Sequence, residues 1–219
     1  PAARRDFLHW RRLAEARAKT FGNDSRNDTY ADACARRPAV PRFRSTERGG
    51  PTVIETVTDG AVCVVTLDRP DRRNALTPAA LDALESAVED TEAPVIYLCG
   101  AGPAFCAGAD LDAVAALADR AAAEAFARRG QAVATTIAES EAVVVAGIDG
   151  AARGGGVELA LACDVRVATP DASFAETGAT IGLFGAWGGT VRLPEVLGLG
   201  DAMDLALSGR VLDADEALR

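Results

Sequence analysis

The sequence is poor in two side chains that many enzymes use as nucleophiles, bases or metal ligands. Its single histidine is His9 and its single lysine is Lys19, so residues 51–219 contain neither residue type. Without histidine, a Ser–His or Cys–His nucleophilic pair and a histidine metal site are excluded from this part of the chain. Without lysine, phosphate-loop and Schiff-base chemistry are excluded as well. Backbone amides, carboxylates and arginines remain as the groups available for catalysis.

Several sequence patterns are also missing. GxGxxG does not occur, and Gly150 and Gly154 lack the spacing of a dinucleotide-binding turn. No apolar run approaches the roughly 20 residues that a membrane span needs, and we recognise no signal peptide. The cysteines form no CxxC pair, which favours reduced thiols in a cytoplasmic protein over disulfides or zinc ligands. They are Cys34, Cys63, Cys99, Cys106 and Cys163.

Charge divides the chain into two parts. Residues 1–50 contain 12 Lys and Arg against 6 Asp and Glu, a balance of +6, whereas residues 51–219 contain 11 Arg against 26 Asp and Glu, a balance of −15. We expect residues 1–50 to be a basic extension, disordered or foreign to the domain, with at most one amphipathic helix near residues 5–19. A partner-binding arm is the alternative. The acidic residues 51–219 are expected to form one domain that binds neither nucleic acid nor membranes.

From residue 53 onward the hydrophobic pattern predicts alternating strands and helices. Runs at 53–58 and 61–67 around Asp59-Gly60 predict a hairpin, and Thr77-Pro78 predicts the start of a helix that ends near residue 92. Asp213 and Glu216 resemble a capping box that opens a last helix. Further strands are expected at 94–98, 143–148 and 165–168, and further helices from 110 and at 120–140, 155–163, 188–193 and 201–208. This order indicates an α/β fold with a mixed sheet.

The stretch 148–167, IDGAARGGGVELALACDVRV, contains the strongest candidate for a functional site. Its glycines at 154–156 precede a predicted helix, where backbone amides can approach a ligand and the helix dipole favours negative charge. Glu158 follows in an otherwise apolar segment. A carboxylate beside such amides indicates acid–base chemistry on a substrate that forms an oxyanion. The alternative is a tight strand–helix turn with a solvent-facing Glu158.

Four segments resemble the crotonase, or enoyl-CoA hydratase/isomerase, superfamily. They read LDRPDRRNALT (67–77), AFCAGADL (104–111), GAARGGGVELALACDVRVA (150–168) and GAWGGTVRLPEVLG (185–198), and the resemblance covers residues 53–219 in order. It implies a spiral of ββα units, assembled as a homotrimer or a dimer of trimers, with a last helical segment that this chain lacks. It also implies an acyl-CoA substrate, in which coenzyme A is part of the thioester, and no tightly bound cofactor or metal.

The resemblance further implies the catalytic groups. The amides of Ala109 and Gly155 would hold the thioester oxygen and stabilise an enolate. Glu158 matches one of the two glutamates of a hydratase. The second, four residues after Phe174, is Gly178 here. Glu176 is then either a secondary acid or base or a surface residue.

Binding residues for coenzyme A follow from the same motifs. Two loops are implied to line the nucleotide and pantetheine, with arginines suited to the phosphate oxygens. Their residues are Arg72, Arg73, Asn74, Ala75, Ala107, Asp110 and Leu111. Trp187 either shapes the acyl pocket or packs in the core, and Asp164 is expected to cap or buttress its turn.

The expected function is hydration of a 2-enoyl-CoA with Glu158 as acid and base, as in fatty-acid β-oxidation. The alternatives are an enoyl-CoA isomerase, another crotonase reaction that uses a single carboxylate, and a crotonase-fold protein that binds acyl-CoA without turnover.

Overall fold

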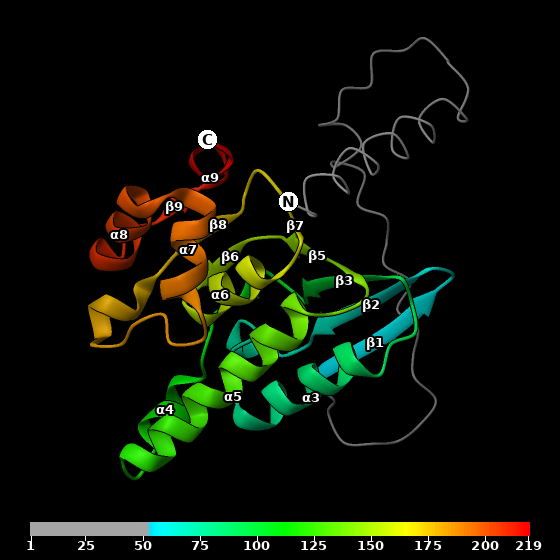
Figure 1. The fold of residues 1–219 in the computed structure, drawn as a ribbon, viewed down its shortest axis with the longest axis horizontal. Helices are drawn as coiled ribbons and strands as arrows, with labels where there is room; N and C mark the ends of the chain where they lie inside the picture. The colour runs from blue at the N-terminus through cyan, green and yellow to red at the C-terminus, as the bar shows by residue number, and fades with distance from the viewer. Residues whose placement is uncertain (1–52) are drawn as a thin grey trace. The chain divides into compact units, whose positions relative to one another are not determined.

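The computed structural model of this protein describes residues 53–219, which form two sheets flanked by helices (Figure 1). The expectations for residues 1–50 lie outside the described residues. The larger sheet has the order β1-β2-β3-β5-β7. Its strands are β1 (Ile54–Asp59), β2 (Val62–Leu67), β3 (Val95–Gly100), β5 (Val143–Ile148) and β7 (Val165–Ala168). β1 and β2 are antiparallel and the other pairs are parallel, so the predicted hairpin and mixed sheet are confirmed.

Two long helices pack side by side against this sheet, and both begin at a side-chain cap. They are α3 (Pro78–Glu89) and α5 (Arg120–Ala138), which Figure 1 shows alongside each other. The Thr77 hydroxyl accepts a hydrogen bond from the Ala80 amide at 3.2 Å, and Asp119 accepts one from Ala122 at 2.8 Å. The predicted start of α3 is therefore confirmed, and its end lies three residues before the predicted one. A third helix, α6 (Gly155–Ala162), follows the glycine turn as predicted.

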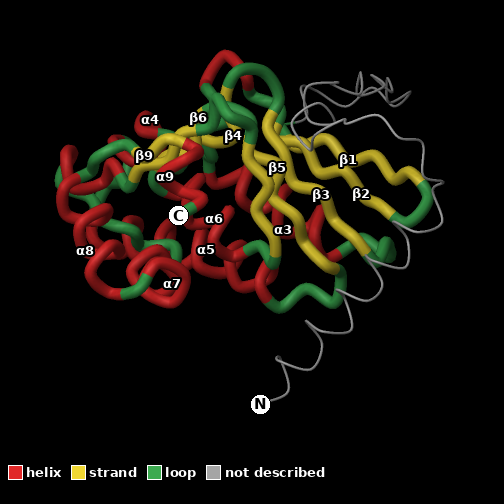
Figure 2. The backbone as a smooth tube through the Cα atoms, turned by 90° about the horizontal axis from the view of Figure 1, so that it is seen from above, coloured by secondary structure: helices red, strands yellow, loops and turns green. Residues whose placement is uncertain are grey.

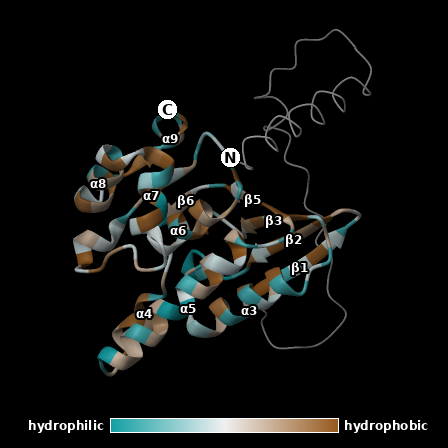
Figure 3. Ribbon diagram, in the orientation of Figure 1, coloured by the Kyte–Doolittle hydropathy of each residue, from teal (hydrophilic) through white to brown (hydrophobic). Residues whose placement is uncertain are grey.

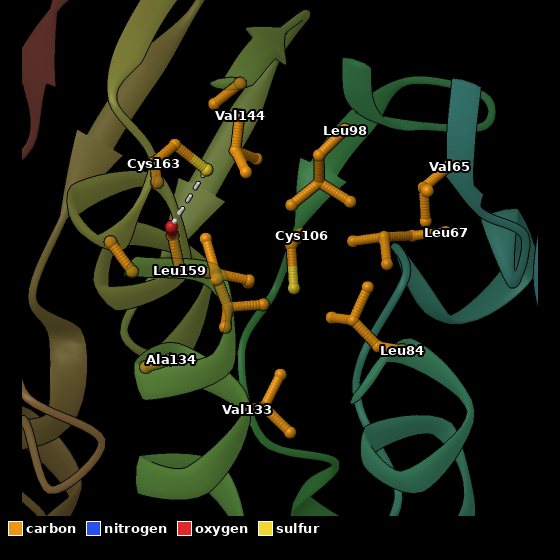
Figure 4. Packing of buried hydrophobic residues seen from close by; sticks show 14 of the residues in the cluster. Val65, Leu67, Leu84, Leu98, Cys106, Val133, Ala134, Val144, Leu159 and Cys163 are labelled. Carbon is orange, nitrogen blue, oxygen red and sulfur yellow. Dashed lines mark hydrogen bonds between the residues drawn. The ribbon is translucent and has the colours of Figure 1, made fainter. Parts of the chain in front are cut away.

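The core lies between the larger sheet and these three helices (Figure 4). Because side chains alternate across a strand, every second residue of β2, β3 and β5 points to the helices. In register, Val65 pairs with Leu98 and Leu98 with Ala146, and all three are buried. Leu84 of α3 and Val133 of α5 are buried in the same cluster. Burying such side chains contributes about 1.5–3 kcal/mol each and is the main stabilising term of this fold.

Cysteines behave as small apolar residues here. Within residues 53–219, Cys63, Cys106 and Cys163 are buried free thiols and Cys99 is half-buried. The Cys163 thiol donates to the carbonyl of Leu159, one turn earlier, at 3.3 Å (Figure 4).

The implied spiral of ββα units contains mixed sheets, but the strands of the second sheet were not predicted individually. This sheet has the order β4-β6-β8-β9, with strands Ala104–Cys106, Ala151–Arg153, Ser173–Ala175 and Leu212–Asp213. Figure 2 shows its labelled strands as a group apart from β1, β2, β3 and β5. Strands of two or three residues are too short to produce a recognisable period. Because β4, β6 and β8 are parallel, the segments that follow them, 107–110, 154–158 and 176–178, begin at one edge of this sheet.

The rest of the described chain is mainly helical. It contains η1 (Pro70–Arg72), α4 (Leu111–Ala115), η2 (Thr177–Ile181), α7 (Gly189–Leu197), α8 (Leu199–Ser208) and α9 (Ala214–Leu218). The Asp213 carboxylate accepts from the Glu216 amide at 2.8 Å, which confirms the predicted cap of the last helix. Figure 3 shows hydrophobic and hydrophilic residues interspersed on α5 and α8. Among helices of the described part, none combines the length and hydropathy needed to cross a membrane.

Candidate active site

The glycine turn joins β6 to α6 and brings three chain segments together. Gly154 adopts φ +46°, a conformation that costs residues with a side chain energy, and its amide donates to the carbonyl of Ala175 in β8 at 2.9 Å. Gly156 packs directly on β4, where a methyl group would collide with the carbonyl oxygen of Cys106. The start of α6 is thus fixed between β4 and β8.

Two backbone amides without a protein acceptor lie on adjacent segments at this edge. The Leu76 amide donates to the Gly108 carbonyl at 2.8 Å, and the Asp110 amide donates to the Leu76 carbonyl at 2.9 Å. The amide of Ala109, which lies between Gly108 and Asp110, has no acceptor in this pairing. Gly155 is the first residue of α6, where an amide has no helical acceptor. Within residues 53–219, neither amide donates a hydrogen bond to the chain. Gly108 packs so closely that a methyl group on it would lie 2.8 Å from the Gly155 nitrogen. The residues implied to form an oxyanion hole are therefore neighbours.

Glu158 lies in the first turn of α6, three residues after Gly155, and is buried, with 3% of its surface exposed. The alternative of a solvent-facing Glu158 is therefore wrong. Its Oε1 accepts hydrogen bonds from the amides of Trp187 and Gly189, both at 2.7 Å. Burial raises the pKa of Glu158, and the amides of Gly189 and Trp187 and the charge of Arg192 offset this only in part. The carboxylate is thus held in position and favours binding a proton.

The loop that holds Glu158 belongs to the 185–198 motif, but of its residues only Trp187 was considered for the site. A methyl group on Gly189 would lie 3.1 Å from Oε1 of Glu158, so the loop approaches the carboxylate closely. Trp187 is buried, and its ring meets Phe126 of α5 edge-on at 5.8 Å between centroids. Gln131 of α5 donates to the carbonyl of Ala186 at 2.7 Å. Because methyl groups on Gly130 and Gly155 would both collide with its ring, Trp187 packs between α5 and the start of α6. The glycine cluster at 185–189 was the sequence feature that indicated such a closely packed loop.

Asp164 has the buttressing role that we expected. Its Oδ2 accepts a hydrogen bond from the Val144 amide at 2.8 Å, and its own amide donates to the Val144 carbonyl at 2.9 Å. These two bonds tie the end of α6 to β5.

Glu176 lies at the same edge and is also buried, with 4% of its surface exposed. It directly follows Ala175, the acceptor of the Gly154 amide. Its Oε1 is buried without a hydrogen-bond partner among the described residues. Burial, together with the charge of Glu158, raises the pKa of Glu176 to about 8. The alternative of a surface Glu176 is therefore wrong.

Asn74, expected to contact coenzyme A, has its side chain directed into the protein. Its Nδ2 donates to the carbonyls of Ala101 and Ala104 at 2.9 and 2.7 Å, and Oδ1 accepts from the Arg69 amide at 2.9 Å. The residue is buried with φ +58°, a conformation that asparagine tolerates better than most residues. Asn74 is thus a structural anchor that joins the 69–76 loop to β4 and to Ala101 before it.

Asp110 is likewise committed to internal contacts. It caps α4 by accepting from the amides of Asp112 and Ala113, and it pairs with Arg69 at 3.1 Å. Burial alone would raise the pKa of Asp110, but the Ala113 amide and the Arg69 guanidinium outweigh it and hold the pKa below its usual value. Arg72 is half-exposed and pairs with Asp112 and, at 3.7 Å, with Asp110.

The remaining expected binding residues lie at the surface or line the loops. Arg73 is exposed, and its carbonyl accepts from the Ala107 amide at 2.9 Å, which joins the two loops implied to hold coenzyme A. Arg73 forms no ion pair with the described residues. Leu111 is exposed, Ala107 is half-buried and Ala75 is buried. Arg73 is therefore the arginine of this loop with the charge most available to a phosphate.

Replacing Asn74 by alanine is expected to lower the free energy of unfolding by about 1–3 kcal/mol, because buried carbonyls lose their donor. Thermal denaturation measures this, and Asp112→Asn is the control because it breaks an exposed ion pair, which contributes little. An unchanged melting temperature with a raised KM for acyl-CoA would instead place Asn74 in the ligand site.

The two sheets and the amide-lined turn define a crotonase-type fold. The chain belongs to the enoyl-CoA hydratase/isomerase family, whose sequence model matches residues 57–219. It is 37% identical over 167 residues to a Mycobacterium bovis protein named "Probable enoyl-CoA hydratase echA8", covering 74% of this chain and 63% of that protein. It is 34% identical over 183 residues to the peroxisomal Delta(3,5)-Delta(2,4)-dienoyl-CoA isomerase of Arabidopsis thaliana, covering 75% and 65%.

A solved structure agrees with this assignment. The crystal structure of enoyl-CoA hydratase from Bacillus anthracis superposes with a TM-score of 0.72 at 33% identity, covering 76% of this chain and 66% of that one. The chain thus spans less than two thirds of the length of the two curated relatives. The predicted fold class is confirmed.

Proposed function

We propose that this chain belongs to an enzyme that hydrates a 2-enoyl-CoA by stabilising a thioester enolate. The observation that carries the proposal is the pair of partnerless amides, Ala109 and Gly155, together with the buried Glu158 in the first turn of the helix that Gly155 begins. Two amides aimed at one thioester oxygen would stabilise the developing charge, and removing one oxyanion-hole donor from a serine protease costs about 2.7–4 kcal/mol. The donors belong to the backbone and are held in place by β4, β6 and the start of α6.

Glu158 supplies the base. In the proposed reaction it takes a proton from water, the water oxygen bonds to the β-carbon, and the electron pair of the double bond moves to the thioester oxygen. The enolate then takes a proton at the α-carbon, which gives a 3-hydroxyacyl-CoA. The two amides from Trp187 and Gly189 hold Oε1, so the carboxylate keeps one orientation throughout.

Coenzyme A would be bound as part of the substrate, by the two joined loops, with Arg73 near a phosphate and no tightly bound cofactor. We also propose a place in fatty-acid β-oxidation and, since the described cysteines are thiols, in the cytoplasm. An exposed apolar stripe on α8, formed by Leu199, Met203 and Leu207, supports self-association, for which we propose a homotrimer or a dimer of trimers. Light scattering on the full chain tests the assembly.

The second candidate function is an enoyl-CoA isomerase. Gly178 stands where a hydratase has its second glutamate, and one base can move a proton between the α- and γ-carbons of an enolate. The similarity to a dienoyl-CoA isomerase is compatible with this reaction. An acyl-CoA-binding protein without turnover is the non-enzyme alternative.

The test supplies the full chain with crotonyl-CoA and, separately, with a 3-enoyl-CoA. We expect crotonyl-CoA to lose the absorbance of its conjugated thioester as water adds. Conversion of the 3-enoyl-CoA without hydration of crotonyl-CoA would favour the isomerase. Tight acyl-CoA binding without turnover of either substrate would establish the binding protein.

A further inference from the structure

Glu176 is a buried carboxyl that the structure of the protein alone does not explain. Buried polar atoms are nearly always hydrogen-bonded, and an unpaired one costs about 1–3 kcal/mol. Oε1 of Glu176 has no partner within residues 53–219, although the neighbouring Glu158 has two amide donors on a single oxygen. An orphaned carboxyl of this kind suggests that its partner is a substrate or a water molecule bound during the reaction.

The register of the second sheet sets the position of Glu176. Arg153 pairs with Ala175 at the ends of β6 and β8, and the residues that follow them are Gly154 and Glu176, respectively. The Glu158 amide donates to the Gly154 carbonyl at 3.1 Å, so both glutamates adjoin Gly154, one from α6 and one from β8. Gly178, two residues later, leaves no side chain that could take this position. A methyl group there would lie 3.0 Å from the carbonyl of Leu183, which leaves little room for a longer one.

We propose that Glu176 is the second proton-transferring carboxyl of the site, approaching the α-carbon from the end of β8 in place of a residue at position 178. This rests on the proposed function. In hydration, Glu158 accepts the proton of the attacking water, and the carboxylic acid of Glu176 gives its proton to the α-carbon of the enolate. One proton has then left Glu176 and one has joined Glu158, and exchange with solvent restores both groups. No other reactant is required.

The charges around Glu176 favour the acid form. Glu158 on α6 is the charged group that acts on it directly, and it raises the pKa of Glu176 in addition to burial. Arg192 on α7 acts on Glu158 and lowers the pKa of that group instead. Glu158 as the base and Glu176 as the acid is therefore the division that the surroundings favour.

Deuterium exchange at the α-carbon distinguishes the roles of the two glutamates. Butyryl-CoA in D2O has no double bond to hydrate, so exchange at its α-carbon needs only the oxyanion hole and the group that carries the α-proton. We expect Glu176→Gln to lose both exchange and crotonyl-CoA hydration by about 10²–10⁴-fold, and Glu158→Gln to lose hydration while exchange persists. Loss of exchange in Glu158→Gln with exchange retained in Glu176→Gln would overturn the assignment. If the unchanged protein neither exchanges nor hydrates, the proposed function fails instead.

The pH dependence gives a second readout. Hydration needs the acid form of Glu176 and should fall as pH rises past about 8, whereas exchange needs the carboxylate and should rise over the same range. Because the folded protein holds a proton that the unfolded chain releases near pH 4.5, its melting temperature should fall as pH rises from about 5 to about 8. Glu176→Gln should show a smaller fall, because only the raised pKa of Glu158 then contributes to it, and its melting transition also shows whether the variant is folded. If it does not fold, Glu176→Asp is used, and unchanged exchange in that variant overturns the proposal.

Discussion

Glu158→Gln is expected to lower kcat for crotonyl-CoA hydration by about 10²–10⁴-fold, the usual contribution of a positioned acid–base group. Glutamine keeps the size of the side chain, and its amide oxygen can still accept the hydrogen bonds from Trp187 and Gly189. The substrate contacts proposed for Ala109, Gly155 and Arg73 are unchanged, so the Kd for acyl-CoA should stay within a few-fold. Stopped-flow or steady-state absorbance with a separate binding titration measures the two effects.

The matched control is Glu124→Gln on α5. Glu124 is exposed and pairs with Arg128 one turn away, a contact that contributes little to stability. This variant should keep wild-type kcat and melting temperature. Full activity in Glu158→Gln would contradict the acid–base role of Glu158. A large increase in the Kd for acyl-CoA would instead show that the residue binds substrate rather than transfers a proton.

Local sequence patterns were sufficient to predict those helices and strands whose own residues show the periodicity or the cap. The alternation in β2 and the Thr77-Pro78 cap of α3 depend on neighbouring residues, so both were predictable. The strands of the second sheet contain two or three residues, and each exists only because it pairs with a strand 20 or more residues away. Yet that pairing brings Ala109, Gly155 and Glu176 to one edge. The residues of the proposed oxyanion hole were thus implied by resemblance, while their proximity could be learned only from the fold.

Site residues with polar side chains were the hardest to interpret from sequence. Asn74 and Asp110 lie in loops expected to contact coenzyme A, but their partners are carbonyls, amides and Arg69 of the protein itself. A sequence shows that a polar residue is present, but it does not show whether the surrounding protein groups form hydrogen bonds with its side chain. Glu176 illustrates the opposite outcome, because burial without a partner distinguishes it from a surface glutamate. The sequence left Glu176 open as a secondary acid or base or a surface residue, and only its burial in the fold distinguishes the two.

The packing of the glycine turn leads to the second prediction with a large effect, on Gly156. A methyl group on Gly156 would collide with the carbonyl oxygen of Cys106 and would lie 2.9 Å from its carbonyl carbon. Cys106 belongs to β4, which is paired with β6, so its carbonyl cannot withdraw without disturbing the sheet. We expect Gly156→Ala to lower the free energy of unfolding by about 1–3 kcal/mol through overpacking.

The same collision should reduce catalysis, because it separates the two segments that provide the amides. Gly155 directly precedes the altered residue, and Ala109 lies three residues after Cys106. Displacing one oxyanion donor typically lowers kcat by about 10²–10³-fold, which should be visible at temperatures where Gly156→Ala is fully folded. The control is Gly200→Ala on α8, where a methyl group meets no atom within 4 Å and helix propensity predicts a gain of about 0.5–1 kcal/mol. If Gly156→Ala melted like the unchanged protein and kept its kcat, the close contact between α6 and β4 would not be what aligns the two amides.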